Sequence, residues 1–281
     1  MDSHERVFVV TGASSGIGAA AAVELARRGG TVVSVGRDER RLARVADRIA
    51  TAGGRAAEPL SADFASLAQV RRLGSELLER HRRIDVLVNN AGTYAHRREL
   101  TEDGHERTFA VNHLAPFLLT NLLLDRLRSS AQARVVVTAS DAHRGGVLDF
   151  DDLELERRWS GLRAYANSKL ANVLFTRALA RRLEDRRGVA NCFHPGVVAT
   201  RLVRGGLAAL AWAPVRVVGR RPRSGADTLV YLAHSLEAGD FTGEYFVDRR
   251  PSTLLGQAAD GHAAELLWER SEAMVGMRGE G

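Results

Sequence analysis

Near its N-terminus the chain reads Val7-Phe8-Val9-Val10-Thr11-Gly12-Ala13-Ser14-Ser15-Gly16-Ile17-Gly18, and this stretch decides the fold. A short apolar run typical of a buried strand leads into three glycines, and an alanine-rich helical pattern continues to about residue 28. Glycine at such a turn permits a tight bend, lets backbone N–H groups approach a phosphate, and lets the helix pack closely on the strand. The helix N-terminus then faces the anion. The unit predicts a dinucleotide site made by Gly12, Ser14, Ser15, Gly16, Ile17 and Gly18. An empty glycine turn is the alternative, because the spacing Gly-x3-Gly-x-Gly departs from the usual fingerprint.

Valine-rich runs and helical patterns alternate along the rest of the chain. Strand-like runs recur at 31–35, 56–60, 86–89, 134–138, 189–193 and 244–247, with helical patterns at 39–50, 67–81, 104–127, 162–187 and 226–236. Continuous apolar runs of this kind are typical of parallel strands buried on both faces. Right-handed crossovers between them place helices on both sides of the sheet. We therefore predict an α/β Rossmann fold in a single domain, 1–248: a doubly wound parallel sheet of about seven strands with helices on both faces. A C-terminal tail, 249–281, follows it.

The charge of the chain is high but evenly spread. Of 281 residues, 40 are basic, and the formal net charge is +6. All but one of the basic residues are arginines interleaved with 34 acids, and Lys169 is the single lysine. Because a nucleic-acid-binding protein concentrates its cations on one face or tail, this pattern argues against nucleic acid as a partner. Arginine stands in for lysine throughout, so the position that keeps lysine is informative.

Cysteine content and hydropathy exclude several other classes of protein. A single cysteine, Cys192, rules out an internal disulfide and a site built from several cysteines, and it is expected to be a small buried group. No metal site is predicted. No run reaches the roughly 18–20 apolar residues of a membrane span. The nearest, 202–218, either makes a peripheral membrane contact or covers an apolar ligand, and we favour the cover. The polar start of the chain shows no secretory signal, so we expect a cytoplasmic protein.

The end of the second strand bears on which dinucleotide binds. An acid there accepts hydrogen bonds from the ribose hydroxyls of NAD, whereas a cation meets the 2′-phosphate of NADP. Gly36 offers no acid, and Arg37 follows it with a guanidinium that can fork onto phosphate. Asp38 is the competing acid, or it caps the next helix. We favour NADP(H), with NAD(H) as the alternative.

Tyr165 and Lys169 form the strongest candidate catalytic pair. In a helix, positions i and i+4 lie on one face, so the phenol and the ammonium are neighbours. Proton transfer to a carbonyl oxygen needs an acid with a pKa near the working pH, and a nearby cation lowers the pKa of a phenol. A surface pair is the alternative. Since arginine serves elsewhere, the lone lysine indicates a position that requires a compact ammonium.

Several motifs in the expected order make the chain resemble the short-chain dehydrogenases/reductases over about residues 5–248. They are Thr11 to Gly18, Asp63, Asn89 to Gly92, Asn112, Ser140, the pair Tyr165 and Lys169, and the run from Pro195 to Thr200. Within that family the chain is most similar to the retinol dehydrogenase and WW-domain oxidoreductase branch, through Val111 to Thr120, Ser140 to His143 and Tyr165 to Arg177. That branch usually has two serines at the catalytic serine, and this chain has Ala139 before Ser140. The 25 positions from Ser140 to Tyr165 fit the insert that the branch carries.

The resemblance implies a role for each matching residue. Tyr165 is expected to be the general acid and base, Lys169 to lower its pKa and hold the ribose, Ser140 to bind the substrate oxygen, and Asn112 to anchor a water. The cofactor site is expected to include Arg37, Asp63, Phe64, Asn90, Ala91, Gly92, Tyr165, Lys169, Pro195, Val198 and Thr200, with Asp63 at the adenine and Val198 and Thr200 at the carboxamide. His96, His143 and His194 are interpreted as packing or loop contacts.

The substrate side is expected to be built from the loops 93–103, 141–160 and 200–223. The last contains Leu202, Val203, Leu207, Leu210 and Trp212, an apolar set suited to a lipophilic or aromatic ketone, aldehyde or alcohol. We predict an NADP(H)-dependent oxidoreductase that is a monomer or a homodimer. One alternative keeps the fold but acts on a conjugated double bond, or by epimerisation or dehydration. A remote alternative is a nucleotide-sensing regulator without catalysis.

Overall fold

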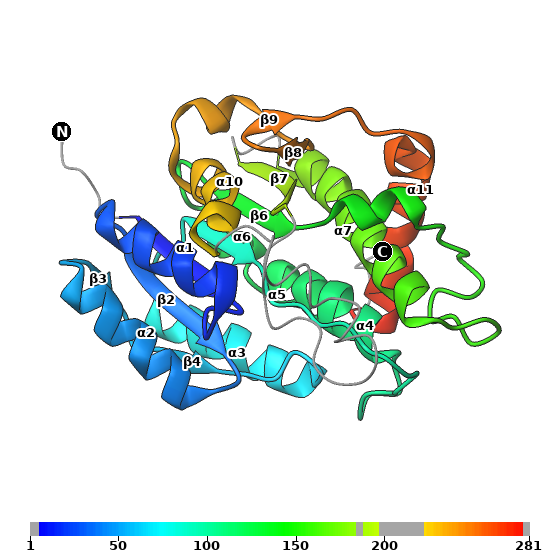
Figure 1. Ribbon diagram of the computed structural model, residues 1–281, viewed down its shortest axis with the longest axis horizontal. Coiled ribbons are helices and arrows are strands. Elements are labelled where there is room, and N and C mark those ends of the chain that lie inside the picture. The colour runs from blue at the N-terminus through cyan, green and yellow to red at the C-terminus, as the bar shows by residue number, and fades with distance from the viewer. Residues whose placement is uncertain (1–5, 184–187, 197–221, 278–281) are drawn as a thin grey trace.

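One mostly parallel sheet organises the residues that the structure, a computed structural model, describes: 6–183, 188–196 and 222–277. Nine strands lie within these ranges, in the order β3-β2-β1-β5-β6-β7-β8-β9 with β4 also paired to β2 (Figure 1). They are β1 (Val7–Thr11), β2 (Thr31–Gly36), β3 (Arg55–Ala56), β4 (Leu60–Ser61), β5 (Val86–Asn89), β6 (Arg134–Thr138), β7 (Val189–His194), β8 (Tyr245–Val247) and β9 (Arg250–Pro251). Only the pairing of β8 with β9 is antiparallel among them.

Helices cover both faces of this sheet, as the α/β pattern predicts. They are α1 (Gly16–Arg27), α2 (Glu39–Thr51), α3 (Leu67–Arg80), α4 (Arg107–Phe109), the π-helix η1 (Ala110–Leu114), α5 (Ala115–Leu122), α6 (Leu124–Arg128), the 3-10 helix η2 (Asp141–Gly145), α7 (Gly161–Leu183), α10 (Pro222–His234), the 3-10 turns η4 (Glu237–Asp240) and η5 (Gly256–Ala259), and α11 (Gly261–Met274). Helices α1, α2 and α10 pack on one side, and α3, α5, α7 and α11 on the other.

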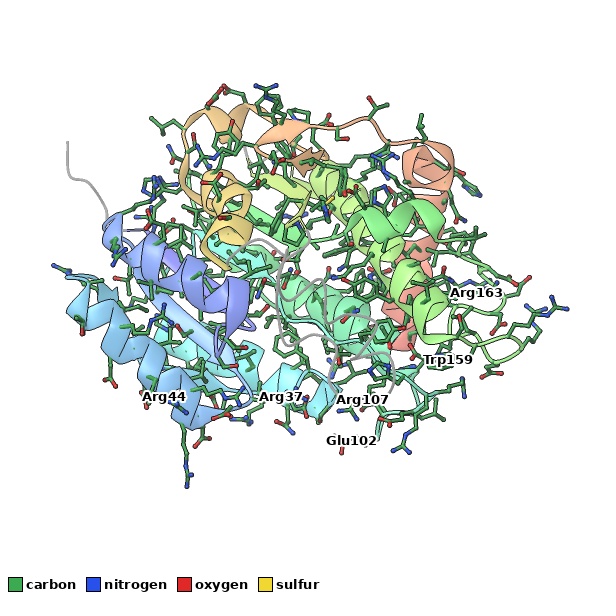
Figure 2. The ribbon with its side chains drawn as sticks, in the orientation of Figure 1. Arg37, Arg44, Glu102, Arg107, Trp159 and Arg163 are labelled. Carbon is green, nitrogen blue, oxygen red and sulfur yellow. The ribbon has the colours of Figure 1, made fainter. Side chains whose placement is uncertain are left out.

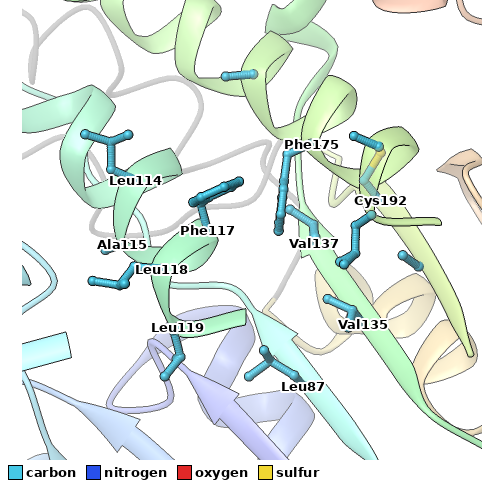
Figure 3. Packing of buried hydrophobic residues seen from close by; sticks show 14 of the residues in the cluster. Leu87, Leu114, Ala115, Phe117, Leu118, Leu119, Val135, Val137, Phe175 and Cys192 are labelled. Carbon is cyan, nitrogen blue, oxygen red and sulfur yellow. The ribbon is translucent and has the colours of Figure 1, made fainter. Parts of the chain in front are cut away.

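Alternate residues of the central strands build two separate cores. Phe8 and Val10 of β1 point to the α1 and α10 side, while Val9 points to the opposite side. This follows from the two-residue period of a strand, which sends neighbouring side chains to opposite faces. The larger core joins Leu87, Val135 and Val137 to Phe117 and Phe175 of the covering helices. In Figure 3 Cys192 lies beside them, and it is buried, as expected for the single cysteine.

The strand count exceeds the predicted number of about seven for two local reasons. The run expected at 56–60 is split into β3 and β4, and Pro59 between them has no N–H to donate to a ladder. The second reason is β9, which returns through a two-residue hairpin with Asp248 and Arg249 at φ 48° and 63°. Two successive residues with positive φ are typical of a type I′ turn, which usually contains glycine and so carried no signal here.

The segment 249–281, assigned to a tail from the sequence, packs on the domain through residue 277. Helix α11 lies along α7 (Figure 1). Its Trp268 is buried against Phe117 and Phe175, with ring centroids 4.8 and 5.9 Å away. The helix therefore completes the larger core behind α5 and α7.

The sheet order places a ligand edge between β1 and β5. These strands are neighbours, yet the chain leaves β1 toward β2 on one side and returns to β5 on the other. Doubly wound sheets bind ligands outside the carboxyl ends of the strands at such a switch point. The glycine turn after β1 and the turn after β5 meet at this edge.

Candidate active site

The turn after β1 leaves the N-terminus of α1 free for an anion. Gly12 and Gly16 have φ of 66° and 59°, a region that favours glycine. A Cβ on Gly18 would lie 2.5 Å from the carbonyl oxygen of Gly12, so only glycine lets helix and turn approach this closely. Ser15 at the N-cap makes no side-chain hydrogen bond to the helix, and the first turn carries no acid. The first N–H groups and the helix dipole thus favour a negative group. Ile17, also predicted for this site, is a member of the core under α1.

Thr11 ties the turn after β5 to the glycine turn. Its hydroxyl accepts hydrogen bonds from the backbone N–H groups of Asn90 (2.9 Å) and Ala91 (3.0 Å). The Asn90 side chain donates in return to the carbonyl of Thr11 at 2.9 Å. Because a Cβ on Gly12 would lie 2.9 Å from the Cα of Ala91, the two turns are in direct contact. Asn90, Ala91 and Gly92 therefore border the same edge as the glycine turn, as predicted from their motif.

At the end of β2, the side chains of Arg37 and Asp38 have different partners. Asp38 caps α2, because its carboxylate accepts from the backbone N–H of Arg41 at 3.1 Å and pairs with the Arg41 guanidinium at 2.9 Å. Arg37 is 62% exposed, and its guanidinium lies 3.8 Å from the carboxylate of Asp63. A Cβ on Gly36 would lie 3.2 Å from the Cβ of Ser14, so β2 ends against the glycine turn. In the view of Figure 2, Arg37 lies between Arg44 and Arg107 along the lower border of the molecule.

Asp63 and Phe64 differ in how they face this edge. One carboxylate oxygen of Asp63 accepts from the backbone N–H of Ala65 at 3.0 Å and faces Arg37. Phe64 instead buries its side chain in the larger core. The structure thus brings Asp63, but not the ring of Phe64, to the edge near Arg37.

Asn112 lies in the π-helix η1, within a segment expected to be an ordinary helix. Its carbonyl oxygen accepts from the backbone N–H of Thr93 at 2.7 Å, and its amide donates to the carbonyl of Thr93 at 3.0 Å. The same amide donates to the Ser168 hydroxyl at 2.9 Å, which in turn donates to the backbone carbonyl of Tyr165 at 2.8 Å. Single π turns often occur at functional sites, where they re-aim a side chain. Asn112 is thereby fixed between the turn after β5 and helix α7.

Tyr165, Ser140 and Lys169 converge at the carboxyl end of β6. Ser140 follows that strand and lies close enough to Tyr165 of α7 to lower the pKa of its phenol. Lys169 is 4% exposed, and its ammonium donates to the carbonyl of Thr138 at 2.9 Å. The ammonium lies 5.5 Å from the centroid of the Tyr165 ring, as expected for positions i and i+4. Together with Asn112, these residues gather around the N-terminal half of α7.

Burial dominates the titration of this pair. It raises the pKa of Tyr165 to about 12, and the hydrogen bond with Ser140 acts in the opposite direction. It lowers the pKa of Lys169 to about 8. The sequence predicts that Lys169 lowers the pKa of Tyr165, and the protein's own side chains do not produce that result. The ammonium bonds the Thr138 carbonyl, and desolvation favours the neutral form of both groups.

Residues that the sequence did not single out hold this arrangement. Thr138 accepts from both Lys169 and Asn172, and Ser168 links Asn112 to the helix of Tyr165. Ser168 lies within the motif from Tyr165 to Lys169, which was the available signal. Thr138 acts through its backbone carbonyl, so its residue type gives no signal of this role in the sequence.

A second group of polar residues supports the turn after Ser140. Asp141 accepts a hydrogen bond from the buried Tyr245 hydroxyl at 2.8 Å and donates its backbone N–H to His194 at 3.3 Å. His143 is buried 4.6 Å from the Tyr245 ring and bonds the carbonyl of Ser140 at 2.7 Å. His143 and His194 are therefore loop and packing contacts, while His96 packs against the ring of Tyr94. Pro195 directly follows β7. Val198, Thr200 and the segment 202–218 lie outside the described residues.

Comparison with known proteins identifies the family. A family model described as short chain dehydrogenase matches residues 6–208. The chain is a short-chain dehydrogenase. A "Putative daunorubicin C-13 ketoreductase" of Streptomyces sp. (strain C5) is 46% identical to it over 96% of this chain and 93% of the relative. Human retinol dehydrogenase 14 is 41% identical over 98% of this chain and 87% of its own length.

Solved structures agree with the family. A crystal structure of an uncharacterized protein from Mycobacterium paratuberculosis has a TM-score of 0.78 and 35% identity, covering 96% of this chain and 93% of the other. A structure from Beutenbergia cavernae, described as an NAD(P) dependent gluconate 5-dehydrogenase with bound NADP, has a TM-score of 0.69 and 32% identity, covering 85% and 93%.

These findings confirm the predicted family, its retinol dehydrogenase-like branch and its Rossmann fold. This short-chain dehydrogenase is an oxidoreductase that acts on alcohol and carbonyl groups, and its family uses NAD(P). Within the described ranges, no helix combines the length and the apolar character that crossing a membrane requires.

Proposed function

We propose that the protein interconverts a lipophilic or aromatic ketone or aldehyde and its alcohol with NADP(H), using Tyr165 as the general acid and base. The observation that carries the proposal is the buried ammonium of Lys169, 5.5 Å from the centroid of the Tyr165 ring, with Ser140 close enough to lower the pKa of the phenol. In reduction the phenol donates its proton to the carbonyl oxygen, and in oxidation it takes the proton back. Ser140 donates a hydrogen bond to the same oxygen, where negative charge develops.

The other polar residues position the acid and the ribose. An ammonium has three donors, so Lys169 can bond the Thr138 carbonyl and still hold ribose hydroxyls. A Cβ on Gly92 would lie 3.3 Å from Asn112 and 3.9 Å from the Lys169 ammonium, so Gly92 keeps the approach to that ammonium open. Asn112 borders the same approach to the ammonium and is held there by its bonds to Thr93 and Ser168.

The edge of the sheet fits a dinucleotide with a 2′-phosphate. The uncapped N-terminus of α1 suits the pyrophosphate, and when the cofactor is bound its nicotinamide exchanges a hydride with the substrate carbon. Asp38, the acid next to the end of β2, is engaged as a helix cap, and Gly36 has no carboxylate to offer the ribose hydroxyls. The exposed guanidinium of Arg37 is then the group for the phosphate.

The lipophilic substrate class is supported by the relatives. One of them is named for a ketone of daunorubicin and another for retinol. The physiological direction we propose is reduction, in keeping with NADP(H) as the cofactor.

Substitution of Tyr165 tests the general acid. We expect Tyr165→Phe to lower the rate of ketone reduction by about 10²–10⁴-fold, the usual contribution of general acid catalysis, while NADPH affinity stays unchanged. Turnover of a panel of lipophilic ketones and aldehydes and NADPH binding by fluorescence check this. Product analysis should find the carbonyl group converted to an alcohol. A variant as active as the parent, or a product that keeps its carbonyl, would refute the proposal.

Substitution of Arg37 tests the choice of cofactor separately. We expect Arg37→Ala to raise KM for NADPH about tenfold or more, the loss of one charge-assisted phosphate contact, and to leave KM for NADH within about twofold. Arg44→Ala is the matched control, since Arg44 is another exposed arginine on the following helix (Figure 2). Equal changes with both cofactors would assign Arg37 no role at the phosphate.

A further inference from the structure

A second tyrosine lies beside the candidate general acid. The rings of Tyr94 and Tyr165 have centroids 5.8 Å apart and planes inclined by 57°. Tyr94 comes two residues after Gly92, the end of the turn at the cofactor edge, and it is half-buried. The ring thus borders the place where the reacting carbonyl must lie if Tyr165 is to protonate it.

Close backbone packing fixes the position of Tyr94. A Cβ on Gly161, the first residue of α7, would lie 2.4 Å from the carbonyl oxygen of Ala95 and 3.0 Å from the hydroxyl of Tyr94. The loop that carries Tyr94 therefore rests directly on the start of the helix that carries Tyr165. The ring also contacts His96, with centroids 5.1 Å apart. The ring is thus packed against the start of α7 and against His96.

Space and apolar surface lie next to this ring. A surface hollow beside it is lined by residues 93–97 together with Glu99 and Arg107. Leu162 lies one helical turn before Tyr165 on the same face of α7 and is 67% exposed. A ligand that reaches Tyr165 can therefore meet an aromatic ring and an exposed leucine side chain.

We infer that Tyr94 is a substrate-contacting specificity residue, an aromatic wall that selects substrates with a planar ring system next to the reacting carbonyl. The inference rests on the proposed function and narrows its substrate class to aryl ketones and aldehydes. Aromatic rings gain energy from tilted or offset contacts with other rings beyond the area they bury, whereas flexible aliphatic chains lack this gain. Tyr94 thus distinguishes flat from aliphatic ligands.

Two ketones and four variants test the inference. The probes are 2-acetylanthracene, which is planar and fluorescent, and 2-octanone. We expect Tyr94→Ala to lower kcat/KM for 2-acetylanthracene about tenfold, mainly through KM, a change of about 1.4 kcal/mol, and to leave 2-octanone within about twofold. Tyr94→Phe should keep the parent preference, and Tyr94→Leu should lose it. Leu236→Ala is the matched control, a truncation of an exposed side chain outside the expected substrate loops, and it should change neither substrate.

Equal losses on both ketones would overturn the inference, because they would show that Tyr94 only supports the loop or Tyr165. If the parent enzyme reduces neither ketone, the proposed function fails, and direct binding decides the inference by itself. Fluorescence titration of 2-acetylanthracene should then show an affinity about tenfold weaker in Tyr94→Ala and unchanged in Tyr94→Phe. Parent protein that does not bind 2-acetylanthracene, or a Tyr94→Ala variant that binds it as tightly, overturns the inference.

Discussion

Lys169 occupies a place that an arginine side chain does not fit. Its ammonium is buried between the Thr138 carbonyl and the ring of Tyr165, and Gly92 approaches it closely. A guanidinium is planar and larger, so it cannot bond that carbonyl from the same position. The surroundings therefore give a physical reason for the single lysine in a chain of arginines.

We expect Lys169→Arg to lower kcat/KM for ketone reduction by about 100-fold or more, the scale of a lost positioning group in an active site. Arg163→Lys, an exposed conservative exchange on the same helix, should stay within about twofold of the parent. Steady-state kinetics with NADPH measure both. Comparable activity of Lys169→Arg and the parent would mean that any cation serves at this position.

The lowered pKa of Lys169 also sets a pH dependence. Because burial brings that pKa to about 8, the ammonium is present below this pH and is lost above it. We expect kcat/KM for NADPH, which reports the free enzyme, to fall as the pH rises through about 8. Tyr165 stays protonated over the same range, since its pKa is raised to about 12. A flat profile up to pH 10 would contradict this assignment.

At the scale of elements, His105 joins three segments on the substrate side. One ring nitrogen lies 2.9 Å from the carboxylate of Glu154, and the other lies 3.0 Å from the carbonyl of Met274 at the end of α11. Both partners accept hydrogen bonds, so the imidazolium satisfies both contacts at once. Glu154 and the nearby Asp103 raise the pKa of His105, against the effect of burial.

The raised pKa makes this link stronger in acid. The folded state holds the proton more tightly than the unfolded chain, so the stabilisation is complete below about pH 6.5, the unfolded pKa, and disappears as the pH rises through the folded pKa. We expect His105→Gln to lower Tm at pH 5.5 by a few degrees and less at pH 8.5. His262→Gln, at an exposed histidine, is the control. A gap that does not narrow with pH would exclude the protonated link.

At the scale of the whole molecule, α11 supports the active site from behind. Trp268 packs on Phe117 of α5 and Phe175 of α7, and these helices continue from the segments that carry Asn112 and Lys169. The guanidinium of Arg182 lies 3.9 Å from the Trp268 ring centroid, which adds a cation–π contact. Loss of this contact region should therefore reduce both stability and activity.

We expect Trp268→Ala to lower the free energy of unfolding by about 3–5 kcal/mol, the usual cost of removing a buried tryptophan. Leu236→Ala, which truncates an exposed leucine, should change it by less than about 0.5 kcal/mol. Urea denaturation measures both. A loss below about 1 kcal/mol at Trp268 would indicate that the segment after 249 is dispensable for the fold.

Local spacing and periodicity determined much of this protein in advance. Helical spacing makes Tyr165 and Lys169 neighbours, and the glycines after β1 form the turn because few other residues can adopt it. The alternating runs predicted the sheet and its two helical layers, since strand and helix periods are properties of short stretches. These features need only residues that are close in sequence.

Contacts between distant residues were decided by the tertiary structure alone. The fold brings Ser140 to Tyr165 and fixes Asn112 in a π turn between Thr93 and Ser168. The pKa values of Tyr165 and Lys169 depend on how much water the surrounding residues exclude, and no local pattern records that. Short motifs therefore identify the site residues, but the surrounding packing sets their pKa values, because desolvation depends on the whole packed molecule and not on any one segment of it.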